Sequence, residues 1–233
     1  MQKFSYIDLL AKHGIDGAHP GGLPLTGGLL GREAISGNTA LLDIGCGTGQ
    51  TAAFAAKHYG CNVIAADINT SMLMHAARRF TSMRLPIGLV YANAMKLPFP
   101  SESFDIVLSE SVTIFTKIHR SLKEYFRVLK PGGILIDIEL TSESPLTEAE
   151  TRDVTDVLVV EKVPTQDEWC SLLNSAGFRN IQIFKGVMMP WTGYLSLQLL
   201  HDFLPYFFLM HKYRHKLGYR VYRCEVFSQI KGL

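Results

Sequence analysis

Short apolar runs alternate with longer amphipathic runs along most of the chain, and this alternation is typical of βαβ units that share a parallel sheet. Strands are predicted at residues 39–44, 62–67, 87–91, 104–109, 134–140, 180–185 and 219–228. Amphipathic helices are predicted at residues 50–59, 71–80, 119–129 and 165–176. The pattern therefore indicates an α/β fold.

Local signals mark where these helices begin and end. Gly60 ends the alanine-rich first helix, and Ser71 is the predicted N-cap of the second. The turn Pro131-Gly132-Gly133 is predicted to close the helix before the fifth strand. A capping box formed by Thr165 and Glu168 opens the last predicted helix. Each predicted helix thus has a physical start or stop.

Three stretches do not follow the alternation. Residues 19–28 are too rich in glycine and proline for a helix or a central strand, so they are predicted as a loop. Residues 141–164 are predicted as a polar connection. About thirty residues, 187–217, separate the last two strands, far more than a hairpin needs, and are predicted as a substrate lid. Within them, residues 187–210 are long enough to cross a bilayer, but Asp202 and two prolines interrupt them, so stable membrane insertion is not expected.

The composition indicates a single globular domain. The 233 residues fit one domain with an N-terminal cap and loop (1–38), a first half (39–140) and a C-terminal half (141–233). Hydrophobic residues make up 47% of the chain, enough to bury a core without disulfides. The net charge of +2 decides little, but the densest basic run, at 211–216, is short and confined to one segment, so nucleic acid is not an expected partner. Four cysteines without metal-ligand spacing, and an N-terminus without an apolar signal segment, predict reduced thiols, no metal site and a cytoplasmic protein.

The stretch from Leu41 to Gln50 joins an apolar strand, a carboxylate and three alternating glycines. Such a strand-to-helix turn needs residues without a side chain where a ligand approaches the main chain. A nicotinamide-binding turn has G-x-G-x-x-G spacing, whereas here the third glycine comes one position early and Gln50 follows it. The Asp43 carboxylate would repel a pyrophosphate but suits a cofactor that carries an amino group and a sulfonium. An ordinary glycine turn stays open as an alternative, and a nicotinamide oxidoreductase is disfavoured.

Four ordered motifs resemble those of class I S-adenosylmethionine (SAM) dependent methyltransferases. Asp43-Ile44-Gly45-Cys46-Gly47-Thr48-Gly49 resembles the first motif, and Asp67 ends the second strand as the ribose-binding carboxylate of that family does. Residues 92–100 with 103–107 resemble the small-molecule methyltransferase type 11 group, which includes ubiquinone and menaquinone methylases. Residues 127–133 resemble the turn before its fifth strand. The resemblance implies a doubly wound, Rossmann-like, seven-stranded mostly parallel sheet with an antiparallel last strand and helices on both faces.

The resemblance also implies SAM as the cofactor. Asp67 would accept hydrogen bonds from both ribose hydroxyls, and Asn93 replaces the usual aspartate that accepts a bond from the adenine amino group. Asn93 is alternatively a loop residue that caps the next turn, and Asp105 is expected to have a structural role. The predicted cofactor-binding residues are Asp43, Gly45, Cys46, Gly47, Thr48, Gly49, Asp67, Ile68, Asn69, Met72, Asn93, Ala94, Met95, Ser109 and Glu110.

The predicted function is methyl transfer from SAM to a small, apolar or aromatic acceptor. A base is optional because a sulfonium is already a good leaving group; Glu110, His119 and His19 are the candidates, each alternatively an ordinary surface or loop residue. Residues 19–28 are hypothesised to close over the site or to be a plain linker. The apolar residues 188–210 are predicted to contact the acceptor, with plain core or a homodimer interface as the alternatives. The alternative function is a non-catalytic SAM-binding sensor or assembly protein.

Overall fold

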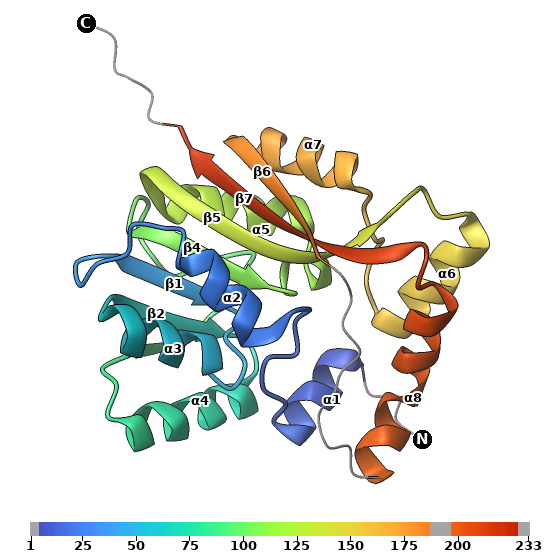
Figure 1. Cartoon of the computed structure of the whole chain (residues 1–233), viewed down its shortest axis with the longest axis horizontal. Helices are drawn as coiled ribbons and strands as arrows, with labels where there is room; N and C mark the ends of the chain where they lie inside the picture. Colours follow the sequence, from blue (N-terminus) through green and yellow to red (C-terminus); the bar gives the residue numbers. More distant parts are fainter. Residues whose placement is uncertain (1–4, 187–196, 228–233) are drawn as a thin grey trace, which may run out of the picture.

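A seven-stranded sheet forms the centre of the molecule in the computed structural model, which describes residues 5–186 and 197–227 (Figure 1). The strands are β1 Ala40–Ile44, β2 Asn62–Asp67, β3 Gly88–Tyr91, β4 Phe104–Glu110, β5 Leu129–Ser142, β6 Phe178–Gly186 and β7 Leu217–Val226. Their order is β3-β2-β1-β4-β5-β7-β6, and only β7 runs antiparallel to its neighbours among these strands. The predicted seven-stranded, mostly parallel sheet with an antiparallel last strand is confirmed.

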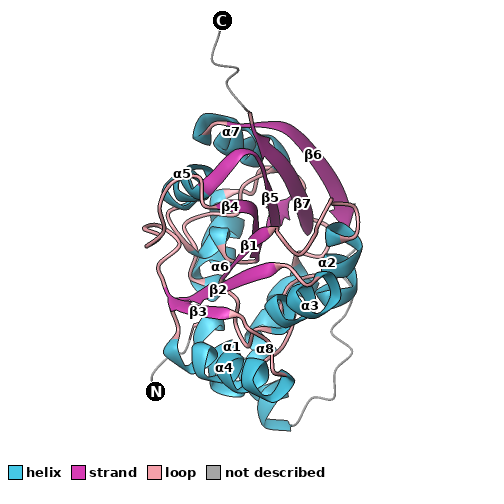
Figure 2. Cartoon of the chain, turned by 90° about the vertical axis from the view of Figure 1, so that its left-hand side faces the viewer, coloured by secondary structure: helices cyan, strands magenta, loops and turns pink. Residues whose placement is uncertain are grey.

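Helices cover both faces of the sheet (Figure 2). The helices are α1 Tyr6–His13, α2 Gly22–Leu30, α3 Gln50–Tyr59, α4 Thr70–Met83, α5 Ile118–Val128, α6 Glu148–Leu158, α7 Gln166–Ala176, α8 Leu197–Lys212 and the 3-10 helix η1 Thr113–Phe115. α2, α3 and α4 share a core with one face, whereas α5 and α7 share a core with the other. α1 and α8 lie side by side in both views.

The sheet is buried on both faces because its central strands are apolar at almost every position. In β1, Leu41 packs into the core under α2, α3 and α4, whereas Leu42 packs into the core under α5 and α7. Parallel strands covered on both faces are expected to be continuously apolar. Trp169 of α7 is fully buried, and its indole N–H donates to the Leu140 carbonyl at 3.2 Å. This bond fixes α7 against β5.

The predicted loop at residues 19–28 is wrong, because most of it belongs to α2. Pro24 lies in the first helical turn, where a missing N–H leaves no intrahelical hydrogen bond unmade. The two leucines that end α2 are buried, so packing outweighs the low helix propensity of the glycines. A Cβ on Gly27 would lie 3.2 Å from the Phe54 ring. Glycine at this position therefore allows α2 to approach α3 closely.

The sequence prediction also misses α1 and α6, although each begins with a capping box. Ser5 and Asp8 bond reciprocally at the start of α1, and Thr147 and Glu150 do the same at the start of α6. The prediction of a polar connection at 141–164 is therefore wrong where α6 lies, and the N-terminal cap and loop contains two helices. The capping boxes are the signal that could have found α1 and α6.

Two boundary signals act at other positions than predicted. Asn69, not Ser71, is the N-cap of α4, since its Oδ1 accepts from the Ser71 and Met72 amides at 2.9 and 3.2 Å. β5 already begins at Leu129, so residues 131–133 lie within the strand, at a shift in its register with β4. The predicted capping box of α7 is confirmed.

The predicted lid between the last two strands is described from residue 197 onward, where it forms α8. Residues 188–196, which carry part of the expected acceptor and homodimer surface, lie outside the described residues. α8 is tied to α1, because Asp202 accepts from Lys12 Nζ at 2.8 Å and lies 2.8 Å from His13 Nε2. Of the helices that the structure describes, none has the length and apolar character needed to cross a membrane.

Candidate functional site

A cavity of about 300 Å³ opens at the carboxyl ends of β1, β2 and β4. The chain builds one side of the sheet from β1 to β3 and then returns to β4 beside β1. Ligands of doubly wound sheets bind at such a switch point. The cavity wall comes from the loop after β1, the ends of β2 and β4, residues 92–95, residues 111–116, and α1 with the residues that follow it.

The loop after β1 exposes its main chain to this cavity. Gly45 and Gly47 have φ angles of 65° and 52°, a region in which other residues are strained. A Cβ on Gly45 would overlap the Val112 side chain. At Gly47, by contrast, nothing lies within 4 Å of an added Cβ, and the residue lines the cavity. A ligand can therefore approach the backbone at Gly47.

Asp67 ends β2 and holds the glycine loop in place. Its Oδ2 accepts from the Gly47 amide at 2.9 Å, and its Oδ1 accepts from the Asn69 amide at 2.8 Å. The side chain lines the cavity, and burial raises the pKa of the carboxyl group. Each carboxylate oxygen keeps a second acceptor position. Asp67 can thus bind a pair of hydroxyl groups while it stays bonded to the loop.

Asp43 brings a second, more deeply buried carboxylate to the cavity. It is 2% exposed, and its Oδ2 has no hydrogen-bond partner in the described chain. Its pKa is raised well above the ordinary value, mainly by burial and further by the negative charges of Glu110 and Asp67. An unpartnered buried carboxylate is costly. A cationic ligand in the cavity would offset that cost.

These features fit the predicted cofactor. SAM carries an ammonium and a sulfonium, which suit the Asp43 environment, and a ribose diol, which suits Asp67. Apolar residues continue the wall beyond Asp67 and suit a planar base: they are Ile68, Met72, Ala94 and Met95. Asn93 also lines the cavity, and its Oδ1 accepts from the Met95 amide at 2.9 Å. Asn93 therefore caps the next turn, as the alternative prediction held, and keeps one acceptor position for a ligand.

Glu110, at the end of β4, ties the N-terminal segment to the sheet. Thr51 of α3 donates to Glu110 Oε2 at 2.7 Å, and Thr26 of α2 donates to Oε1. His19 Nε2 lies 3.4 Å from Oε2. Two candidate bases that are far apart in the sequence thus meet, and both line the cavity.

A second tether holds the residues between α1 and α2 over the cavity. The Asp16 carboxylate accepts from Thr48 and from Arg79, whose Nη2 is 2.7 Å from both oxygens. Gly17 and His19 line the cavity beside this tether. Most of the residues 19–28 that are hypothesised to close over the site therefore lie in α2, which packs on α3, and the residues just before them line the cavity.

Aromatic and aliphatic side chains form another part of the wall. Tyr6 and Leu10 of α1 and Phe115 of η1 line the cavity. Tyr6 stacks on Phe115 with ring centroids 6.1 Å apart, and it contacts Phe203 and Tyr206 of α8 at 5.9 and 4.9 Å. The described part of α8 thus supports the wall from behind and does not line the cavity itself, and Phe203, Tyr206 and Leu209 belong to the core, as the plain-core alternative holds.

Most of the predicted cofactor-binding residues meet in this cavity. Those that line it are Asp43, Gly45, Cys46, Gly47, Thr48, Asp67, Ile68, Asn69, Met72, Asn93, Ala94, Met95 and Glu110. Gly49 is instead the N-cap of α3, and Ser109 is fully buried with its hydroxyl 2.9 Å from that of Thr113. His119 is exposed on α5 and does not line the cavity. Asp105 has the predicted structural role, because it accepts from the first amide of β1 at 2.8 Å.

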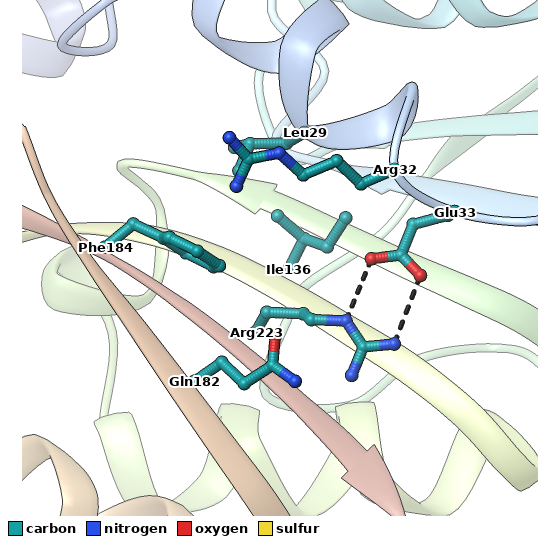
Figure 3. A pocket seen from close by; sticks show the side chains of 7 residues that line it. All are labelled: Leu29, Arg32, Glu33, Ile136, Gln182, Phe184 and Arg223. Atoms are coloured by element: carbon teal, nitrogen blue, oxygen red, sulfur yellow. Dashed lines mark hydrogen bonds and ion pairs between the residues drawn. The ribbon is translucent and has the colours of Figure 1, made fainter.

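A second, smaller cavity of about 230 Å³ lies on the α2 face of the sheet (Figure 3). Glu33 accepts from Arg223 of β7 through both oxygens, at 2.9 and 3.1 Å, as the dashed lines show. The Arg32 guanidinium lies 5.1 Å from the centre of the Phe184 ring. No residue that lines this cavity carries a buried polar atom without a partner, among the side chains that the structure describes. Unmet bonding capacity therefore marks the first cavity as the functional site.

Comparisons with known proteins show which family the chain resembles. The methyltransferase domain family model matches residues 42–137. The uncharacterized methyltransferase YodH of Bacillus subtilis (strain 168) is 41% identical over 177 residues, which cover 76% of each chain. The ubiquinone/menaquinone biosynthesis C-methyltransferase UbiE of Cronobacter sakazakii is 30% identical over 183 residues, which cover 66% of this chain and 73% of that protein.

Solved structures share the fold over almost the whole chain. Phosphoethanolamine N-methyltransferase 2 of Haemonchus contortus, solved in complex with SAM, superimposes with a TM-score of 0.81. The match covers 97% of this chain and 58% of that one, at 17% sequence identity. At this identity the likeness concerns the arrangement of helices and strands alone.

Proposed function

Since the chain belongs to the SAM-dependent methyltransferase family, we propose that it transfers the methyl group of SAM to a small, apolar or aromatic molecule. The observation that carries the proposal is one continuous cavity in which a glycine loop and buried carboxylates face an aromatic wall. The acidic side suits the cofactor, and the aromatic side suits the acceptor.

The chain's own residues bind and orient the cofactor, which supplies an electrophilic methyl group on sulfur when bound. Asp67 would accept from the ribose hydroxyls, and the backbone at Gly47 would lie against the ligand. Asp43, Asp67 and Glu110 bring three carboxylates to one cavity, and their mutual repulsion favours a cationic ligand. Affinity for a cofactor with two positive groups follows from this charge arrangement.

The residues between α1 and α2 exclude water from the reacting groups. The Asp16 tether and the contacts of Glu110 hold this segment against the sheet. A closed cover protects a reactive sulfonium and strengthens electrostatic interactions inside the site. Alignment of the acceptor with the methyl group can supply on the order of 7–11 kcal/mol of the barrier reduction.

The acceptor class is proposed from the chemistry of the wall around Tyr6. The described side chains there are aromatic or aliphatic, and an apolar cavity favours ligands with little charge. Rings prefer stacked or edge-to-face neighbours, so a planar ring suits the wall that Tyr6 and Phe115 form better than a flexible polar chain does.

Calorimetry and a methyl-transfer screen test the proposal together. SAM and S-adenosylhomocysteine should bind the purified protein, whereas NADH should not. Labelled methyl from SAM should then appear on at least one member of a panel of phenols, hydroquinones and hydrophobic amines. Binding without transfer to any compound, including polar and macromolecular acceptors, would favour the sensor alternative. Transfer only to highly polar acceptors would contradict the proposed acceptor class.

A further inference from the structure

His19 presents a buried imidazole nitrogen that has no hydrogen-bond partner. The side chain is 5% exposed and lines the cavity. Its Nδ1 lies 3.3 Å from the Pro20 carbonyl oxygen, which can only accept a hydrogen bond, so Nδ1 carries the proton. The neutral imidazole then has its lone pair on Nε2, the atom without a partner. Its nearest polar neighbour is Glu110 Oε2, at 3.4 Å, so a proton that Nε2 takes from a ligand would lie beside that carboxylate.

Glu110 is fixed so that one of its oxygens meets that imidazole. The Thr51 and Thr26 hydroxyls each hold one carboxylate oxygen, and Oε2 lies 3.4 Å from His19 Nε2. Glu110 itself is only 9% exposed. Glu110 ends β4 and its hydroxyl contacts come from α2 and α3, so three separate elements set the direction of the carboxylate. A proton that reaches Nε2 gains an ion pair with Glu110 in a site shielded from water.

We propose that His19 is the general base of methyl transfer and that Glu110 is the positioning residue that stabilises the resulting imidazolium. The proposal rests on the proposed function and narrows it. It assigns the acceptor to molecules that must lose a proton to be methylated, such as phenols, hydroquinones or protonated amines.

The proton and the electrons balance as follows for an acceptor X–H. His19 Nε2 takes the proton while the electron pair of X forms a bond to the methyl carbon. The bond between that carbon and sulfur breaks, and its electron pair stays on sulfur. The imidazolium pairs with Glu110 and later releases its proton to water, which restores the neutral ring.

Other groups in the cavity are less suited to this role. The titratable residues that line it together with His19 are Tyr6, Asp43, Cys46, Asp67 and Glu110. Burial raises the pKa of Tyr6 to about 12 and raises the pKa of the Cys46 thiol further, so both stay protonated. Each Asp67 oxygen already accepts a hydrogen bond, one from the Gly47 amide and one from the Asn69 amide. Among the described cavity residues, His19 carries the one imidazole.

The first test compares transfer rates in the wild type, His19→Gln and the control His119→Gln, which changes an exposed imidazole outside the cavity. Single-turnover rates are measured against pH with the phenol or hydroquinone that the screen identifies. We expect His19→Gln to lower the rate by about 10²- to 10⁴-fold, as for other general bases. The rise of the rate with pH should disappear, SAM affinity should change less than threefold, and His119→Gln should behave as the wild type.

A second variant distinguishes a general base from a residue that only holds the segment between α1 and α2 in place. Thr26→Val removes the hydrogen bond between α2 and Glu110 but leaves the His19 imidazole in place. The rise of the rate with pH should therefore persist in this variant. If His19→Gln keeps that rise, or loses SAM affinity in parallel with rate, the base assignment fails. A wild type that binds no SAM or transfers no methyl group contradicts the proposed function itself.

Nitrogen NMR gives a readout that needs no acceptor. The spectrum is recorded in the complex with S-adenosylhomocysteine, and the His19 Nε2 resonance is identified by its loss in His19→Gln. At the highest pH of the rate measurements, this resonance should be that of a nitrogen without a proton. Glu110→Gln should make that nitrogen harder to protonate. An Nε2 that carries a proton from pH 6 to 9 would overturn the proposal.

Discussion

The two sides of the cavity are built in different ways. The proposed cofactor side comes from short loops directly after β1 and β2, so Gly47 and Asp67 are placed by strands that pair with each other. The proposed acceptor side comes from α1 and η1, which α8 supports, and these elements lie far apart in the sequence. Local chain geometry therefore fixes the cofactor side, whereas packing between distant elements fixes the acceptor side.

This difference explains how the two sides can vary separately. A strand-to-loop transition has few alternatives once the sheet has formed, because parallel strands end at the same edge. A wall of side chains from three helices can change through single substitutions without altering the sheet. We expect substitutions on the cofactor side to affect SAM binding strongly, and substitutions on the acceptor side to affect the acceptor alone.

The largest effect is expected for Asp67→Ala. The variant loses the two hydrogen bonds that the carboxylate would accept from the ribose, and each bond to a charged group contributes about 1.5–3 kcal/mol. SAM affinity measured by calorimetry should fall on the order of 100-fold or more. Asp105→Ala is the matched control, since that carboxylate bonds to Lys130 and the start of β1 away from the cavity.

Asp67→Asn refines the comparison, because an amide keeps one acceptor oxygen but carries no charge. Its affinity should lie between those of the wild type and Asp67→Ala. If Asp67→Ala retains wild-type affinity for SAM while circular dichroism shows that it stays folded, Asp67 does not bind the ribose.

The sequence predicts well which residues meet on the acidic side of the cavity, because its signals there are local. The glycine run and Asp67 both stand next to apolar runs that are long enough to be strands, so their place at the sheet edge follows from the pattern. Asn93 shows the limit of this reasoning. Its side chain caps a turn and also lines the cavity, and only the structure shows that it does both.

The side of the cavity formed by α1, η1 and the residues before α2 is harder to predict, because the capping box of α1 is local but the contacts that place these elements are not. α2 contains glycines that disfavour a helix and is stabilised by burial against α3, which a sequence pattern does not reveal. The contact between Tyr6 and Tyr206 joins the two ends of the chain. The pairing of His19 with Glu110 likewise depends on where α2 packs.

A pH dependence of SAM affinity is the next largest effect. The pKa values of Asp43 and Asp67 are raised, so these carboxyl groups gain protons as the pH falls toward those values. A cationic ligand binds their ionised forms better and must displace those protons. Affinity is therefore highest above both pKa values and falls as the pH is lowered through them, by up to about tenfold per pH unit for each proton released.

Calorimetry in buffers of different ionisation enthalpy counts the protons released when SAM binds. The wild type should release protons at a pH near the raised values, and Asp67→Asn should release fewer. Affinity that does not change as the pH is lowered from 8 to 5 would mean that these carboxylates do not sense the cofactor's charge.

The smallest effect is expected on the acceptor side, for Phe115→Ala. The variant removes a ring that lines the cavity and stacks on Tyr6, and an aromatic pair contributes about 0.5–1.5 kcal/mol beyond its buried area. The KM for an aromatic acceptor should rise roughly threefold to tenfold, while SAM affinity stays unchanged. Phe126→Ala is the matched control, since Phe126 packs edge-to-face on Phe178 at 5.4 Å away from the cavity. Both variants should lose thermal stability, but only Phe115→Ala should change the acceptor KM. Equal changes in KM in the two variants would show that a general loss of stability weakens acceptor binding, and that the Phe115 ring has no specific contact with the acceptor.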